Sequence, residues 1–480
     1  MTRLQRLTTP SSVFRDDEPF VQSQSLLPGA RSPLFAETVL LDFNGVIERP
    51  TNLYPTEWRI RLDDMSPELN LLARELIMIW FNPRHEVLLA RGIHRKPTPL
   101  SVNTVYGRLG HLRSLDAFGT GLGLQSFSEW CDEDFKAYLA DRDEKAKTNG
   151  RRNISTEHVT LIKNLHQLRD ILAGGGPSSD AWPGMSSRRV VDATPADQLT
   201  TIAIDPQTWF PLVRAAWTYV DRFSADILAA LSCWQRLRDT ARKTSIEQGE
   251  RLLRAWLADP SHKVPVRLTP SGSEINWSLL TWTIGVDLSD ESCQLFATRS
   301  RPGRTRRRLV EEAVSEGRVQ SSLVSDLVEV ERADGTRGPW HPALQARDLW
   351  LERTALRNAC FIFTVALSMM RDNEARAILK GSVVEHYGSP AVKSTKRKLD
   401  PDLPTRHWWI IDPVAKAIDI ASQLSLHDEL AFASVNEGDT DASFESQKAI
   451  DSFIAHVNRF RHRTALAEIP SSKTTPHMFH

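Results

Sequence analysis

One apolar run, "ACFIFTVALSMM" from Ala359 to Met370, most limits how the chain can fold. The run is too short, and too close to charged residues, to cross a bilayer. We therefore expect a core helix that neighbouring elements bury. With 480 residues, the chain is long enough for two or three domains that each bury a core of this kind.

Net charge and cysteine content exclude several classes of protein. Lys plus Arg and Asp plus Glu both total 60, so overall charge cannot attract a polyanion, and any nucleic-acid surface must come from local clustering. The N-terminus has no apolar segment of the kind that a secretory signal requires. The cysteines lack metal-binding spacing and predict reduced thiols and a cytoplasmic location. They are Cys131, Cys233, Cys293 and Cys360.

Local sequence signals predict a mainly α fold with a small β-hairpin or sheet. Ser66 and Pro67 mark the start of the first clear helix. β-Favouring runs such as "INWSLLTWTIGV" predict strands after residue 261, and two more strands are expected around 382–387 and 407–411. The predicted divisions are an N-terminal arm (1–60), a helical domain (61–175), a Gly- and Pro-rich linker (176–204), a helical block with a mixed α/β insertion and an Arg-rich loop (205–343), and a final region (344–480).

The run "RSRPGRTRRR" is the strongest charge cluster in the chain. Six of its ten residues are Arg and none is acidic. A solvated, disordered loop is the simplest interpretation of such a run. Guanidinium groups also bind phosphate through paired hydrogen bonds, so nucleic acid is an equally serious interpretation. The arginines concerned are Arg299, Arg301, Arg304, Arg306, Arg307 and Arg308.

Two other motifs resemble catalytic loops without their context. In "LLDFNGV", Leu40 to Val46, a phosphatase loop would need a second aspartate where Asn44 stands, so a short strand ending in a turn is predicted. "GTGLGL", Gly119 to Leu124, follows a helix, whereas a dinucleotide-binding loop follows a strand. Helix-capping glycines explain that motif.

Arg371 lies at the end of the apolar run, and Glu374 follows three residues later. An arginine at the end of a buried run requires an anionic partner or an open cleft. Glu374 is spaced to orient it across a helical turn. A purely structural ion pair is the alternative.

The order of elements from Leu344 to His480 resembles the catalytic domain of tyrosine recombinases, the phage-integrase family. The order is an apolar helix, Arg-x-x-Glu, a short helix, a strand pair with a lysine-rich connection, a helix, and finally Thr-Pro-His in "TTPH". The resemblance implies a helical core-binding domain over 61–175 and an α+β catalytic domain over 344–480. It implies that Arg371 and His477 are catalytic, that Glu374 supports Arg371, and that one hairpin lysine is catalytic. The candidate lysines are Lys393, Lys396 and Lys398.

The resemblance implies an activity in the integration or recombination of DNA, as in phages and other mobile elements. A tyrosine attacks a phosphodiester and keeps the bond energy in a phosphotyrosyl link. Fixed cations stabilise the charged transition state, so no metal or cofactor is required. The expected partner is double-stranded DNA, bound by a possible homo-oligomer, and no membrane is involved. Arg397 and Arg406 are further expected DNA contacts, with the arginines of the 299–308 run.

The sequence departs from the family at its last residues. The second arginine of the box that His477 opens is replaced by His480, and no tyrosine follows the box. We therefore expect a truncated, catalytically inactive homologue. The alternative is a non-catalytic helical DNA-binding or scaffold protein in which the pair Arg371 and Glu374 is structural. The five tyrosines are Tyr54, Tyr106, Tyr138, Tyr219 and Tyr387.

Overall fold

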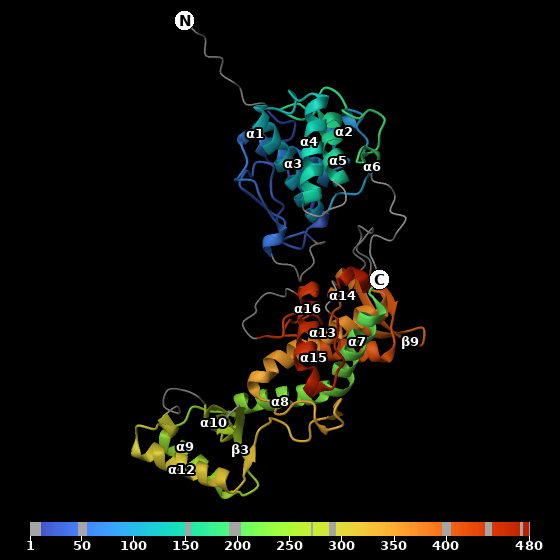
Figure 1. Ribbon diagram of the computed structural model, residues 1–480. Helices are drawn as coiled ribbons and strands as arrows, with labels where there is room; N and C mark the ends of the chain where they lie inside the picture. Colours follow the sequence, from blue (N-terminus) through green and yellow to red (C-terminus); the bar gives the residue numbers. More distant parts are fainter. Residues whose placement is uncertain are drawn as a thin grey trace. The chain divides into compact units, whose positions relative to one another are not determined.

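The computed structural model describes residues 11–46, 55–148, 155–191, 203–269, 272–287, 294–395, 405–436, 444–470 and 474–479 (Figure 1). They fall into two compact units: an N-terminal unit within Met1–Thr200, and a C-terminal unit within Thr201–Lys396 and Pro404–His480. Helices dominate, and the strands form only two- and three-stranded sheets. The predicted fold class, mainly α with a small β-sheet, is confirmed. No helix in the described ranges is long and apolar enough to span a membrane.

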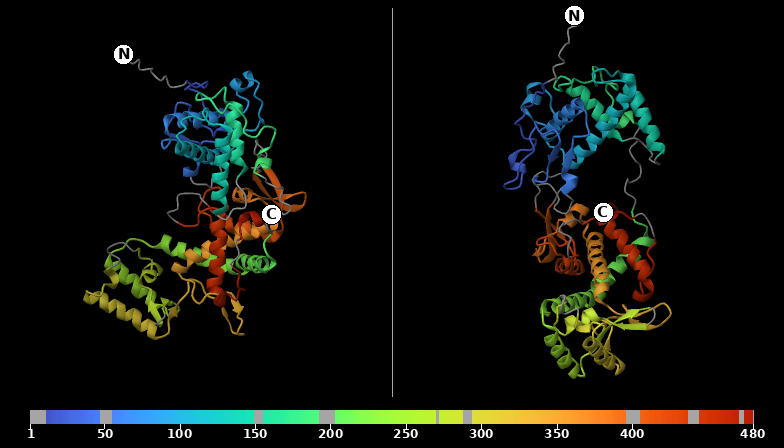
Figure 2. Two further views of the ribbon diagram at one scale, coloured as in Figure 1. Left: turned by 45° about the horizontal axis from the view of Figure 1, so that its top comes forward. Right: turned by 90° about the vertical axis from the view of Figure 1, so that its left-hand side faces the viewer.

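The N-terminal unit packs helices against a short β-hairpin-like pair (Figures 1 and 2). Ser66 caps the first long helix as predicted, because its side chain accepts a hydrogen bond from the Leu69 amide. The helices are α1 (Pro67–Phe81), α2 (Glu86–Ala90), α3 (Val102–Leu122), α4 (Asp132–Thr148), α5 (Thr156–Leu168) and α6 (Ser187–Val190). The strands β1 (Leu40–Asp42) and β2 (Arg59–Arg61) pair antiparallel.

The described part of the expected N-terminal arm belongs to the core of this unit. Phe20, Phe35 and Phe43 are buried together with residues of α1. The loose arm was predicted from the Ser- and Pro-rich composition of this segment. Its aromatic side chains, however, bury enough apolar area to hold the segment in place. Residues 176–191 of the expected linker also pack on the unit, since Lys163 of α5 binds Asp180 at 2.6 Å. Residues 192–202 lie outside the described ranges.

A buried histidine and tyrosine join α4 to α5. Tyr138 Oη lies 2.7 Å from His158 Nδ1, and the His111 ring of α3 lies 4.1 Å from the His158 ring. Burial, together with the positive charges of His111 and Arg142, lowers the pKa of His158 to about 4. His158 is therefore neutral in the folded protein at neutral pH.

The C-terminal unit is built around α13 (Ala346–Ser368), the helix that the apolar run predicted. Cys360, Phe361 and Ile362 have no exposed surface. The other helices are α7 (Pro206–Thr218), α8 (Ser224–Thr240), α9 (Ile246–Ala258), α10 (Trp277–Thr283), α12 (Arg301–Ser315), α14 (Asp372–Arg376), α15 (Asp412–Leu424) and α16 (Ser446–Thr464). A π-helical turn, Tyr219–Phe223, joins α7 to α8.

The strands of this unit form three small sheets. β8 (Val383–His386), β9 (Ser389–Thr395) and β10 (Thr405–Trp409) make an antiparallel sheet in the order β10-β9-β8, as the sequence predicted for the first and last of them. β3 (Val264–Thr269) pairs with β4 (Gly272–Ile275) and with β5 (Val319–Gln320). β6 (Glu329–Glu331) pairs with β7 (Arg337–Pro339).

An insertion between α8 and α13 has its own hydrophobic core, formed by α9, α10, α12 and β3 (Figure 1). Leu253, Leu280 and Val310 are fully buried there. The expected strand over "INWSLLTWTIGV" is wrong for Trp277–Thr283, which form α10. The Asn276 side chain accepts a hydrogen bond from the Leu279 amide and starts a helix, so local capping outweighs β propensity.

A buried carboxylate, Glu352 of α13, gathers polar groups from several elements of the C-terminal unit. Arg463 of α16 binds it, His456 Nε2 lies 3.3 Å from Oε2, and the Tyr219 hydroxyl donates to Oε2 at 3.2 Å. Arg463 also lies 2.5 Å from His341 Nε2. Burial acts to raise the pKa of Glu352, but His456, Arg463 and His341 outweigh burial and lower it.

Replacing Glu352 by Ala should lower the free energy of unfolding by about 3–5 kcal/mol, because the largely covered Arg463 charge would lose its carboxylate. Glu468→Ala is the matched control. Glu468 forms an ion pair at the surface with Arg461, which lies on α16 as Arg463 does. That change should cost less than about 1 kcal/mol. Urea unfolding followed by circular dichroism measures both. Equal losses in the two variants would contradict the assigned role of Glu352.

Acid should destabilise the N-terminal unit through His158. The folded pKa of about 4 lies below the ordinary value of 6.5. The stability that neutral His158 contributes to folding is therefore fully present above pH 6.5. It is lost as the pH falls towards 4, and the free energy of unfolding should drop by up to roughly 3 kcal/mol. Pulsed hydrogen exchange of α5 peptides along a urea gradient measures this. His158→Gln should flatten the pH dependence, and an unchanged slope would count against the histidine.

Candidate nucleic-acid interface

Arg371 lies at a break between two helices. α13 ends at Ser368, its C-cap Met369 adopts a left-handed conformation with φ of 56°, and Arg371 is the N-cap of α14. Met370 between them is fully buried. The buried methionine fixes the backbone on one side of Arg371, while 44% of the arginine side chain is exposed. The guanidinium is thus held on a rigid support and accessible to solvent.

Glu374 holds Arg371 by its backbone and its side chain. Its Oε2 accepts a hydrogen bond from the Arg371 amide at 2.9 Å, and its Oε1 lies 3.6 Å from Arg371 Nη1. The Glu374 side chain is only 5% exposed. The predicted pairing is confirmed, but its geometry is that of a capping box at the start of α14 and not of two positions within one long helix.

The sheet β8–β10 is fastened to this break. Ser394 of β9 donates a hydrogen bond to the Glu374 carbonyl at 2.7 Å. Val392, two residues earlier and on the same face, belongs to the main core of the unit. This inner face of the sheet therefore faces α14 and α15.

Of the three expected lysines, the described residues include Lys393, and its strand position does not direct it to Arg371. Lys393 is adjacent to Ser394 on β9, so its side chain points to the opposite, outer face of the sheet. Lys396, Arg397 and Lys398 lie outside the described residues. Arg406 on β10 is paired in register with Ser394 and is exposed on the α14 side.

The turn Pro476–Phe479 carries His477, whose side chain lies outside the described residues. Its neighbour Phe479 is buried and packs on Trp209 of α7, with ring centroids 5.6 Å apart. The histidine backbone is thus anchored to the unit by a buried aromatic contact.

The expected Arg-rich loop is wrong: most of it is the first half of α12. Ser300 caps the helix by accepting a hydrogen bond from the Gly303 amide at 3.1 Å, and Pro302 follows in the first turn. A Cβ at position 303 would lie 2.2 Å from the Ala297 carbonyl oxygen, so only glycine fits. The cap and the buried Val310 outweigh the mutual repulsion of the arginines.

The arginines of this helix divide into structural and exposed ones. Arg306 is buried and binds Glu250 at 2.7 Å, and the Arg307 guanidinium covers the Trp277 ring at 4.3 Å. Arg308 pairs with Glu312 at 3.4 Å. The exposed arginines nearest the helix start are Arg299, Arg301 and Arg304.

The charge order of α12 opposes the helix dipole. Cations are favoured at a C-terminus and anions at an N-terminus, yet the first turn of α12 has no acidic residue and the last turn no basic one. Arg301 and Arg304 add full positive charges to the partial positive charge of the unpaired amides. This arrangement costs stability and concentrates a positive potential that attracts anions.

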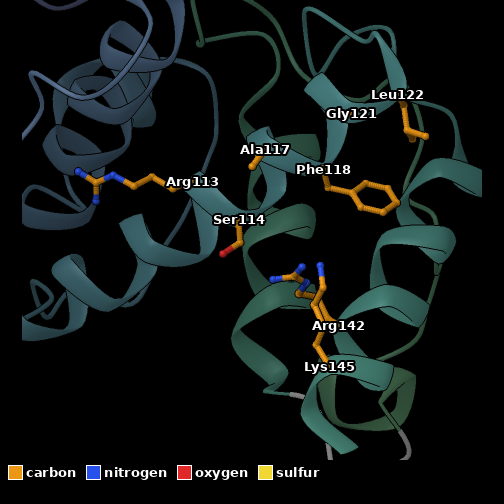
Figure 3. Close-up of a pocket in the computed structure, with 8 residues that line it drawn as sticks. All are labelled: Arg113, Ser114, Ala117, Phe118, Gly121, Leu122, Arg142 and Lys145. Atoms are coloured by element: carbon orange, nitrogen blue, oxygen red, sulfur yellow. The ribbon is translucent and has the colours of Figure 1, made fainter. Parts of the chain in front are cut away.

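Sequence reasoning missed a basic cavity of about 550 Å³ on the N-terminal unit (Figure 3). Arg142 and Lys145 of α4 form one wall and share the carboxylate of Asp141. Figure 3 shows Arg113 of α3 extending away from them. Ala117 and Gly121 of α3 are small residues four positions apart, so they leave room for the cavity on one side of the helix. Their spacing is the sequence signal that could have predicted it.

The two other motifs behave as predicted. Asp42 accepts hydrogen bonds from the backbone and side chain of Asn44 in a turn after β1. Gly123, with φ of 79°, caps α3. Within the described ranges, no three His, Cys, Asp or Glu residues are grouped as metal ligands would be.

Comparison of the chain with models of protein families, with curated proteins and with solved structures found no match.

Proposed function

We propose that this protein is a DNA-binding recombinase homologue of the tyrosine recombinase type. The observation that carries the proposal is the exposed Arg371 guanidinium, supported from below by the buried carboxylate of Glu374. Glu374 fixes the Arg371 backbone, and the planar guanidinium above it has the geometry to pair with a phosphate. The element order α13, Arg-x-x-Glu, β8–β10, α15, α16 supports the same proposal.

The exposed arginines of α12 would supply sequence-independent contacts. Arg301 and Arg304 lie three residues apart and share the exposed face of the helix. Side chains of this kind bind phosphates of any duplex and release counterions, so they add affinity without reading bases. In this proposal Arg371 contacts one particular phosphate, and α12 increases overall affinity.

The alternative, a helical scaffold protein, would leave the Arg371–Glu374 pair with a local structural role alone. Duplex binding separates the two functions, because a scaffold has no reason to bind DNA with a steep salt dependence. The five residues of α14 are too few for a helix terminus alone to bind an anion strongly, so the arginine is the group to test.

Replacing both Arg301 and Arg304 by Gln should weaken binding of a mixed-sequence duplex and reduce the slope of log K against log salt by about 2. Fluorescence anisotropy between about 50 and 400 mM salt measures the slope. Arg236→Gln with Arg337→Gln is the control, since it removes two exposed charges of the same unit elsewhere. Identical slopes for the two double variants would exclude α12 as a contact.

Arg371→Ala should reduce affinity for a preferred site roughly tenfold or more, the usual loss for a hydrogen bond to a charged group. The site is obtained by selection from a random duplex pool with the unaltered protein. Affinity for a scrambled duplex should change less than about twofold, because one phosphate contact among many is lost. A uniform loss on both duplexes would reassign Arg371 to general binding, and no loss on either would favour the scaffold.

A further inference from the structure

The outer face of the sheet β8–β10 carries an aromatic cluster that the α14 site does not use. The register pairs Ala391 with Val384 and Trp409, and Lys393 with His407. Side chains two apart on a strand share a face, so His386 lies on this face as well. We call these residues, with Tyr387 at the hairpin tip, the outer aromatic face.

The rings of this face are arranged as flat, accessible surfaces. His386 and His407 stack with centroids 4.0 Å apart and an angle of 4° between their planes. Trp409 lies 5.2 Å from His386 and 6.4 Å from Tyr387. Tyr387 is 88% exposed and Trp409 is 54% exposed, whereas Ala391 beneath the rings is fully buried. Large aromatic surfaces left in water mark a binding site more often than they serve stability.

Tyr387 at the hairpin tip adopts a left-handed backbone conformation that tyrosine disfavours. Tyr387 has φ of 49° and precedes Gly388 at 73°. Two consecutive positive φ values define a turn in which Asn-Gly or Gly-Gly is favoured. Tyrosine at this position costs free energy and exposes its ring, so the fold gains nothing that Asn would not supply.

Charge on this face selects the class of partner. Lys393 is exposed beside His407, and Glu385 alternates to the other side of β8. Among the outward positions of the three described strands, Lys393 is the one charged side chain, and it lies beside the aromatic rings with no carboxylate on the same face. Nucleobases stack on such rings irrespective of sequence, and a neighbouring lysine binds the phosphate between them. An aliphatic peptide added to a sheet would instead need apolar pockets for its side chains.

We infer that the outer aromatic face binds single-stranded DNA. Bases stack on Trp409, Tyr387 and the histidine pair, and Lys393 contacts the backbone. This site is distinct from the duplex contacts of Arg371 and α12, and it rests on the proposed function only for the choice of DNA as the nucleic acid.

The test is binding of a fluorescent oligothymidine of about 15 nucleotides by the full chain, followed by anisotropy. Trp409→Ala should weaken binding about tenfold, the loss typical of one stacked base. Trp350→Ala is the matched control, because Trp350 on α13 is also 54% exposed. It should bind as the unaltered protein does.

Tyr387→Asn separates binding from folding. Asn is favoured at a left-handed turn position, so this variant should melt at the same temperature or higher while it binds oligothymidine more weakly. Lys393→Gln should reduce the salt slope by about 0.7, the value for one phosphate of a single strand. Trp409→Phe should restore most of the affinity that Trp409→Ala loses.

Three outcomes would overturn the inference. The first is absence of oligothymidine binding by the unaltered protein, and the second is equal binding by the Trp409→Ala and Trp350→Ala variants. The third is loss of self-association in Trp409→Ala by analytical ultracentrifugation with unchanged oligothymidine binding, which would assign the face to a second copy of the chain. Duplex binding measured in parallel tests the proposed function separately, since neither tryptophan belongs to that site.

Discussion

The C-terminal unit depends on a carboxylate buried in its centre. Glu352 lies on the same helix whose apolar end precedes Arg371, and its partners come from α16, from the π-helical turn after α7 and from the loop before α13. A buried charge is tolerated only when its partners are correctly placed, so these elements can pack in few other ways. The network thereby fixes where α13 ends, and with it where Arg371 and Glu374 stand relative to the sheet.

Local signals in the sequence predicted the elements whose ends have a chemical cause. Ser66 and Pro67 start α1, the apolar run forms α13, and the strands β8 and β10 fall where alternation and turns placed them. The Arg299–Arg308 run was misjudged, because Arg306 is buried through a carboxylate 56 positions away, a distance that no local window covers. The prediction of a loose N-terminal arm was wrong for a similar reason, because its phenylalanines are buried by α1, which lies later in the sequence.

The candidate site was predictable in part. Arg371 and Glu374 are neighbours in sequence, so their pairing follows from spacing alone. Strand alternation also explains why Lys393 and Ser394 face opposite sides once the register is known. The register itself is a tertiary property, as is the approach of α3 to α4 that forms the basic cavity. Histidine stacking between β8 and β10 had no sequence signal, because the two residues are separated by a whole strand and a connection.

The separate core of the insertion between α8 and α13 bears on how such a chain evolves. A segment that buries its own apolar residues places few packing requirements on the rest of the C-terminal unit. Substitutions in α9, α10 and α12 are therefore selected almost independently of the main core. Its attachment to the rest of the unit includes the Gln345 side chain, which donates to the Val266 and Ser321 carbonyls. Related chains can therefore be expected to differ most in this module, exchanging or losing it while α13 and the elements around Glu352 are inherited together.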